Sequence, residues 1–100
     1  MIRRTIIRTK VYEESLNDLP KRIHIEDFED NLANNPLYWS EASGMRDVRK
    51  ARFYIEYNGK KGGGSLFYIY IKAKDEIYLL KLYVKKAQEN LYDEKINERD

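Results

Sequence analysis

The stretch that decides the fold reads VRKARFYIEYNGKKGGGSLFYIYIKAKDEIYLLKLYVK and covers residues 48–85. Three parts of it, 48–55, 66–73 and 76–85, are rich in β-branched and aromatic residues, which is typical of strands. NGKKGGG (58–64) separates the first two parts, and Lys74-Asp75 separates the last two. Because glycine and asparagine tolerate positive φ, the stretch predicts three consecutive antiparallel strands joined by turns.

Alternation along each strand predicts which side chains are buried, because neighbouring residues point to opposite faces of a sheet. The more apolar set, expected on the buried face, comprises Ala51, Phe53, Ile55, Phe67, Ile69, Ile71, Ala73, Tyr78, Leu80, Leu82 and Val84. The opposite face then collects cationic and aromatic side chains from all three strands: Lys50, Arg52, Tyr54, Tyr68, Tyr70, Lys81, Tyr83 and Lys85.

Upstream of this stretch, the sequence predicts one more strand (3–8) and two helices. The first helix follows from apolar residues at i, i+4 and i+7 and ends at proline: Tyr12, Leu16, Leu19 and Pro20. The second repeats the helical spacing and ends at Asn34-Asn35-Pro36: Ile25, Phe28 and Leu32. A short polar helix is expected from Asn90. The order β-α-α-β-β-β(-α) predicts an α+β domain in which two N-terminal helices pack on one face of a small, largely antiparallel sheet.

The bulk composition bounds the class of protein. One hundred residues, 42% of them hydrophobic, suit a single domain spanning 1–100. The absence of cysteine excludes disulfides and thiolate metal sites and favours a reducing compartment. No apolar run approaches the roughly 20 residues that a membrane span needs, and no signal-peptide core follows the N-terminus. We therefore expect a cytoplasmic protein with no membrane partner.

The net charge of +2 conceals blocks of opposite sign. Residues 1–10 carry four bases and no acids, whereas 11–43 carry eight acids and two bases. Residues 44–61 carry six bases and two acids, and residues 62–86 carry five lysines and two acids. The last fourteen residues are acidic again. A basic patch on an otherwise balanced protein indicates a polyanion partner.

The expected open face of the sheet suits RNA. Its cations would neutralise phosphates, and its flat aromatics would stack on unpaired bases. A plain solvated face would mix acids with the lysines, and this face has almost none. The alternative interpretation, ordinary solvated tyrosines and lysines, stays open, and RNA binding is the favoured one.

Other candidate sites carry less weight. Gly59–Gly64 offers amides and lysines to a phosphate but joins two strands, so it is not a P-loop. His24, the only histidine, is interpreted as structural rather than catalytic. Asp27, Glu29 and Asp30 spread around a helix and are interpreted as a solvated acidic face. We predict no metal ion and no cofactor.

The order of elements and motifs resembles the RelE/HigB family of bacterial toxins, and its HigB-like branch in particular. The motifs that carry the resemblance are RKARF (49–53), GKKGG (59–63), the aromatic strand around Tyr68 and LLKLYVK (79–85). Family members typically show an "RK-x-R-aromatic" strand, a "GK-x-GG-x-R" hairpin and a "YLL-x-x-Y-x-K" strand. The similarity covers nearly the whole chain and is strongest from residue 44 to 91.

The resemblance implies an mRNA interferase, a metal-independent endoribonuclease that cuts mRNA on the ribosome and is neutralised by a cognate antitoxin. The implied reaction is attack of a ribose 2′-OH on the adjacent phosphate, leaving a cyclic phosphate. Such a reaction needs a proton acceptor, stabilisation of the phosphorane charge and a proton for the leaving 5′-oxygen.

Carried onto this chain, the family pattern gives two groups of site residues. The implied catalytic residues are Lys50 as base or phosphate ligand, Arg52 as charge stabiliser, Lys86, and Tyr92 as a stacking or proton-donating group. The implied RNA-binding residues are Arg49, Tyr54, Lys60, Lys61, Tyr68, Tyr70, Lys81, Tyr83 and Lys85.

Ser65 departs from the family pattern, which has an arginine after the hairpin glycines. Losing one such donor at a scissile phosphate typically costs about a hundredfold to a thousandfold in rate. Lys86-Ala87 also replaces the Asn-Glu pair of the HigB-like branch. Two alternatives therefore stay open. One is a catalytically weakened or inactive RNA- or ribosome-binding protein, and the other is a protein-interaction domain with a basic groove.

Overall fold

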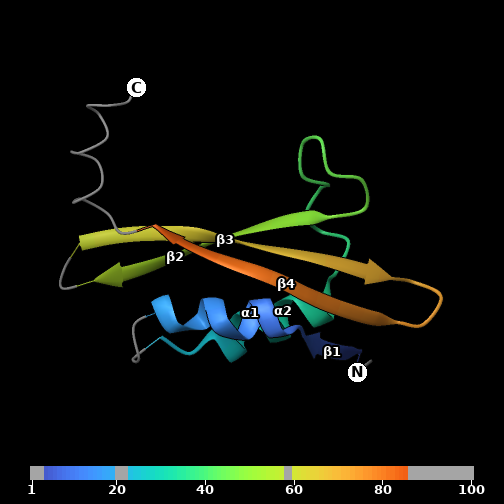
Figure 1. The fold of residues 1–100 in the computed structure, drawn as a ribbon, viewed down its shortest axis with the longest axis horizontal. Coiled ribbons are helices and arrows are strands. Elements are labelled where there is room, and N and C mark those ends of the chain that lie inside the picture. Colours follow the sequence, from blue (N-terminus) through green and yellow to red (C-terminus); the bar gives the residue numbers. More distant parts are fainter. Residues whose placement is uncertain (1–3, 20–22, 58–59, 86–100) are drawn as a thin grey trace.

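The computed structural model describes residues 4–19, 23–57 and 60–85. Two helices lie side by side on one face of a four-stranded sheet (Figure 1). The elements in chain order are β1 (Thr5–Arg8), α1 (Lys10–Ser15), the 3-10 turn η1 (Leu16–Asp18), α2 (Ile25–Asn34), β2 (Arg49–Tyr57), β3 (Lys60–Ile71) and β4 (Glu76–Lys85). The predicted α+β fold, with both N-terminal helices on one side of the sheet, is confirmed.

The sheet is mixed, with the strand order β1-β4-β3-β2. β2, β3 and β4 form an antiparallel meander, and β1 pairs with β4 in parallel. The β3–β4 turn is tight because Asp75 adopts the left-handed conformation, with φ of 56°. No helix in the described part of the chain is long and apolar enough to cross a membrane.

Polar side chains fix both ends of α1. The Thr9 hydroxyl caps the helix by accepting from the Tyr12 amide at 3.2 Å, and it donates to the Leu79 carbonyl at 2.8 Å. The Ser15 hydroxyl donates to the Tyr12 carbonyl and accepts the Leu82 amide at 2.9 Å. The α-helix therefore ends at Ser15, and the rest of the predicted first helix forms η1.

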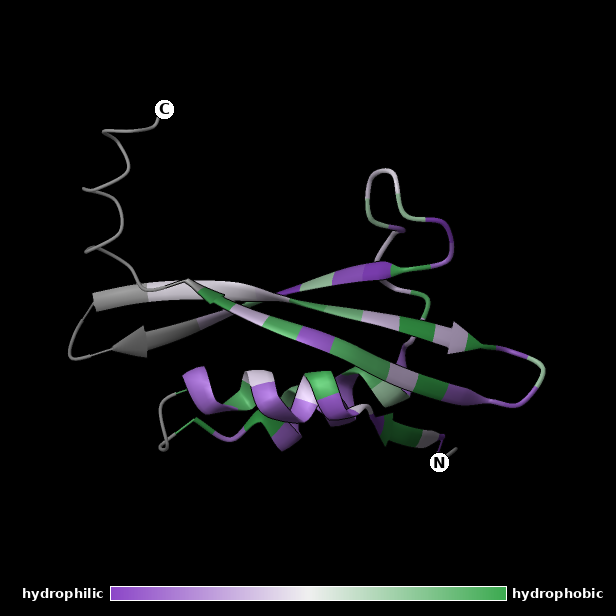
Figure 2. Cartoon of the chain, in the orientation of Figure 1, coloured by the Kyte–Doolittle hydropathy of each residue, from purple (hydrophilic) through white to green (hydrophobic). Residues whose placement is uncertain are grey.

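The core lies between the helices and the meander. It is built from Tyr12, Ile25 and Leu32 of the helices and from Ala51, Phe53, Leu66, Tyr68, Ile77, Leu79 and Leu82 of the strands. Figure 2 shows apolar and polar residues alternating along β4, as a half-covered strand requires. For β2 the predicted orientation is confirmed where side chains are described, because Ala51 and Phe53 are buried while Arg52 and Tyr54 are exposed.

The predicted orientation of β3 was wrong. Leu66 and Tyr68 are fully buried, so Phe67 between them points to the opposite face, together with Ile69. Tyr68 is tolerated in the core because its hydroxyl donates to the Pro36 carbonyl at 2.7 Å. The number of apolar residues favoured burial of the set that contains Phe67 and Ile69. The structure buries Tyr68 instead, because a tyrosine whose hydroxyl has a hydrogen-bond partner can occupy a core position.

The prediction for β4 was half right. Leu82 is buried and Val84 packs against the core, but Ile77 and Leu79, not Tyr78 and Leu80, are buried at the other end of the strand. The phase changes because Phe67 pairs with Lys81 while Tyr68 pairs with Leu79, which leaves Leu80 without a partner in the ladder. This β-bulge flips every side chain on one side of it relative to a regular strand.

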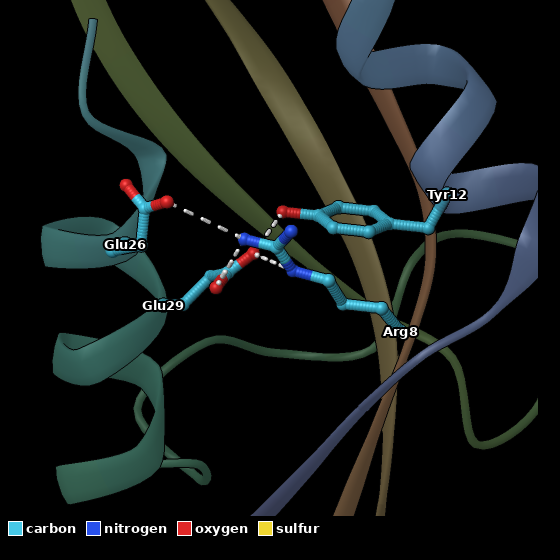
Figure 3. A network of polar contacts seen from close by, with 4 residues as sticks. All are labelled: Arg8, Tyr12, Glu26 and Glu29. Carbon is cyan, nitrogen blue, oxygen red and sulfur yellow. Dashed lines mark hydrogen bonds and ion pairs between the residues drawn. The ribbon is translucent and has the colours of Figure 1, made fainter.

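A buried ion pair ties β1, α1 and α2 together (Figure 3). Both oxygens of Glu29 accept from Arg8, at 2.9 and 3.0 Å, and the Tyr12 hydroxyl donates to the same carboxylate at 2.7 Å. The hydrogen bond to Glu29 raises the pKa of Arg8, although burial opposes this. Burial, then the bond to Glu29, raises the pKa of Tyr12 far above its usual value. The prediction that Glu29 is solvated was wrong, since only 6% of it is exposed.

Candidate nucleic-acid interface

The sheet face opposite α1 and α2, here called the outer face, has no helix over it among the described residues (Figure 1). Strand pairing arranges its side chains in rows that cross β2, β3 and β4. The rows, taken from the register, are Tyr54–Gly63–Lys85, Arg52–Ser65–Tyr83 and Lys50–Phe67–Lys81. Neighbouring strands lie about 4.8 Å apart, so the members of a row are immediate neighbours.

These rows bring together most of the predicted outer residues. Tyr54 is 89% exposed and Tyr83 is 59% exposed, and Arg52 and Lys81 are exposed as well. Lys50 is half-buried, with its Nζ 5.8 Å from the centre of the Phe67 ring. The predicted placement of these five on one open face is confirmed.

Lys50, Arg52 and Lys81, the outer-face cations whose side chains the structure describes, form no ion pair with a described acidic side chain. The ion pairs found among the described residues join Arg4 to Asp75 and Arg8 to Glu26 and Glu29, all away from these rows. Cations that are not engaged with carboxylates attract phosphate groups, and exposed aromatic rings between them offer stacking surfaces. The arrangement suits a single-stranded nucleic acid better than a neutral ligand.

Three residues predicted to bind RNA lie elsewhere. Tyr68 is in the core, where burial raises the pKa of its hydroxyl. The Tyr70 hydroxyl donates to Asp75 at 2.8 Å and accepts from Arg4 at 3.3 Å, next to the core. Arg49 of β2 pairs with Tyr68 of β3, and its side chain donates to the Trp39 carbonyl. The outer placement of both tyrosines was therefore wrong, and Arg49 fastens a loop instead.

That loop, between α2 and β2, rises on the outer side of the sheet (Figure 1). Arg49 holds it at Trp39, and Tyr68 holds it at Pro36. The Tyr38 ring meets the Trp39 ring edge-on, with 5.0 Å between centroids, and remains largely exposed. The loop is thus anchored firmly beside the first residues of β2.

The predicted glycine turn is mostly strand. β3 begins at Lys60 and its glycines pair with β2, so the connection is shorter than the predicted 58–64. A Cβ on Gly64 would lie 2.7 Å from Cζ of Phe53 and would also strike the Tyr83 carbonyl oxygen. These glycines therefore let Phe53 and the neighbouring strands approach the β3 backbone closely.

Several predicted site residues are not characterised by the structure. Lys86 and Tyr92 lie outside the described residues. Lys60, Lys61 and Lys85 hold known positions in their strands, but their side chains are not described. Within residues 4–19, 23–57 and 60–85, no three His, Asp or Glu side chains gather as metal ligands would.

Phe67 is an aromatic outer-face residue that sequence reasoning assigned to the core, as it did Ile69 on the same face. Alternation placed it in the core because Phe67, Ile69 and Ile71 form a more apolar set than Tyr68 and Tyr70. A usable signal was Gly64, which shares the inner face with Leu66 and Tyr68 where the Phe53 ring needs space. Because side chains alternate along β3, Phe67 then points to the outer face.

No protein-family model matches the sequence. Among solved structures, the isolated RelE toxin of Escherichia coli is similar, with a TM-score of 0.63 and 15% identity over 97% of this chain and 99% of that chain. This chain has a RelE-like fold. The RelBE toxin–antitoxin complex of E. coli matches with a TM-score of 0.60 and 14% identity, over 83% of this chain and 98% of that chain.

A third RelE-like match comes from another organism. The toxin–antitoxin complex RelBE2 of Mycobacterium tuberculosis has a TM-score of 0.51 and 16% identity, over 84% of this chain and 100% of that chain. At these identities the matches establish the fold. The predicted RelE-like architecture is thereby confirmed, and the HigB-like branch stays a prediction.

Proposed function

We propose that this protein is the toxin of a toxin–antitoxin pair, an endoribonuclease that cleaves mRNA on the ribosome. The observation that carries the proposal is the outer face, where Lys50, Arg52 and Lys81 lie among exposed tyrosines and form no ion pair with an acid whose side chain the structure describes. On a RelE-like fold, such a face is suited to hold and strain a phosphodiester.

The proposed chemistry uses charged side chains in place of a metal ion. A ribose 2′-OH attacks the adjacent phosphate, a base takes its proton, and the 5′-oxygen leaves with a proton from an acid. Lys50 is proposed as base or phosphate ligand, and Arg52 stabilises the charge that develops on the phosphorane. The proposal assigns Lys86 and Tyr92 to the same reaction on the family pattern alone.

Ser65 favours a second candidate function, an RNA- or ribosome-binding protein with weakened catalysis. It occupies the centre of its row, directly between Arg52 and Tyr83. An arginine at that point would place a second guanidinium against the phosphate, whereas a serine offers one neutral hydroxyl. Arg52, one strand away, is the remaining described cation of the row.

The proposed partners follow from the same fold. Two of the similar structures are complexes of a toxin with its antitoxin. We propose a cognate antitoxin for this chain, together with the ribosome and mRNA, in the cytoplasm. We also assign the protein to the HigB-like branch on the motifs of residues 49–85.

Primer extension on an mRNA in a purified translation system tests the function. We expect discrete cuts that require ribosomes and disappear in the double variant Lys50→Ala, Arg52→Ala. The matched control is Lys72→Ala, Lys74→Ala, which removes the same charge from exposed lysines at the β3–β4 turn. Ribosome binding without cuts would favour the weakened binding protein, and neither binding nor cuts would overturn the RNA interpretation.

A further inference from the structure

We propose that Phe67, flanked by Lys50 and Lys81, is a nucleobase-binding subsite at the centre of the outer face. The inference rests on the proposed RNA binding and adds the place where one unpaired base stacks. It concerns a residue that the sequence pattern assigns to the core and that the structure turns outward.

The register places the ring between two cations. Phe67 pairs with Lys50 of β2 on one side and with Lys81 of β4 on the other, so the three form one row across the sheet. Their side chains share a face, because the flanking Leu66 and Tyr68 are fully buried on the opposite one. The Lys50 ammonium lies 5.8 Å from the ring centroid.

The surroundings of Phe67 differ from those of a packed phenylalanine. Phe53, on the inner face, is buried and meets the Phe28 ring at 5.2 Å between centroids. Phe67 is half-buried, and the Lys50 ammonium lies over its ring, so the ring meets a cation where Phe53 meets another aromatic ring. A ring in this state can exchange the ammonium for a base.

The chemistry of the row fits a nucleotide rather than a bare anion. A base stacked on Phe67 releases the Lys50 ammonium, which then reaches the phosphate of the same nucleotide, while Lys81 meets the next phosphate. Every base has a π-face, so the subsite accepts bases of any sequence and prefers the larger rings.

The test combines a protein variant with a nucleotide variant. Single-stranded RNA with a 2′-O-methyl backbone, which cannot be cleaved, is titrated at low salt with wild type, Phe67→Leu and Ile69→Leu. Leucine keeps apolar bulk and removes the stacking surface, and Ile69, on the same face of β3 two residues away, is the matched control. Each protein is also titrated with the same RNA lacking its bases. Thermal unfolding confirms that the variants fold.

We expect Phe67→Leu to bind the intact RNA about tenfold more weakly than wild type, and the baseless RNA equally. Ile69→Leu should match wild type on both. Equal binding of intact RNA by wild type and Phe67→Leu would overturn the subsite while leaving RNA binding in place. Absence of RNA binding by wild type would overturn the subsite, whereas the ribosome-dependent cleavage assay decides the proposed function separately.

A second readout does not depend on affinity. Trp39 is the only tryptophan, so Trp39→Phe, Phe67→Trp places the sole indole in the subsite. Stacking should quench its emission with intact RNA and not with baseless RNA. If both RNAs bind and quench the tryptophan emission equally, the proposal is contradicted.

Discussion

Phe67 and Tyr68 are consecutive aromatic residues that point to opposite faces of β3. Hydrophobicity alone favours burying the phenylalanine, but the structure buries the tyrosine. The Pro36 carbonyl decides the outcome, because it accepts the Tyr68 hydroxyl and removes the cost of burying it. Phe67 is thereby left on the outer face.

Tyr68→Phe tests this assignment at the residue scale. We expect a loss of about 1–2 kcal/mol in the free energy of unfolding, because the Pro36 carbonyl loses its buried donor. RNA affinity should not change, since the side chain does not reach the outer face. Tyr54→Ala is the opposite control, with little effect on stability and a weaker RNA complex. A reduction in RNA affinity without loss of stability in Tyr68→Phe would contradict the assignment.

Ser65→Arg tests the missing charge. We expect the rate of mRNA cleavage to rise about a hundredfold, because the new guanidinium stands between Arg52 and Tyr83, where the phosphate charge develops. Single-turnover cleavage on programmed ribosomes measures it. Ser65→Gln, which adds length without charge, should change little. An unchanged or reduced rate for Ser65→Arg would place the scissile phosphate elsewhere.

At the scale of elements, β1, α1 and α2 depend on one buried carboxylate. Glu29 joins Arg8 of β1 to Tyr12 of α1 from its place on α2 (Figure 3). Arg8 remains partly exposed, so solvent moderates the cost of breaking the pair.

Glu29→Gln should therefore lower the free energy of unfolding by about 2–3 kcal/mol, since it leaves Arg8 without its buried counter-ion. Urea denaturation measures the change. Asp30→Asn, on the exposed side of the same helix, is the matched control and should stay within about 0.5 kcal/mol of wild type. An equal loss in both variants would show that the ion pair does not hold these elements together.

The β2–β3 hairpin depends on the absence of a side chain at Gly64. Gly64→Ala should cost about 1–3 kcal/mol, because its Cβ would collide with Phe53 and with the Tyr83 carbonyl. Gly44→Ala is the contrasting control, since nothing lies within 4 Å of its Cβ and only its φ of 75° opposes substitution. Chemical denaturation of both variants ranks them. A neutral Gly64→Ala would contradict the close packing.

The type and order of the elements were more predictable than the face of the sheet to which each side chain of a strand points. The order of strands and helices follows from periodicity and turn residues, and β2 alternates as expected. The orientation of β3 depends on the Pro36 carbonyl, a contact between residues 32 positions apart. The phase of β4 depends on a bulge at Leu80, which no local pattern reveals. Lys50, Arg52, Tyr54, Lys81 and Tyr83 were found because they alternate with apolar residues along β2 and along the part of β4 that follows the bulge.

At the scale of the whole molecule, the two sides of the sheet carry opposite charge. The exposed acids of α1 and α2, including Glu13, Glu14 and Asp27, lie on the helical side, whereas Lys50, Arg52 and Lys81 lie on the outer face. Such a distribution orients the molecule toward a polyanion before contact and makes the affinity dependent on salt.

The measurement that tests this account most directly is the affinity for single-stranded RNA across a salt series. Three proteins are compared: wild type, Lys50→Ala/Arg52→Ala and the charge-matched Lys72→Ala/Lys74→Ala. We expect the first pair to weaken binding strongly and to reduce the slope of log affinity against log salt by about 0.7 for each phosphate that the variant no longer neutralises. The second pair should retain nearly the wild-type slope. Equal losses in both pairs would mean that RNA responds only to net charge, which would contradict a binding site on the outer face.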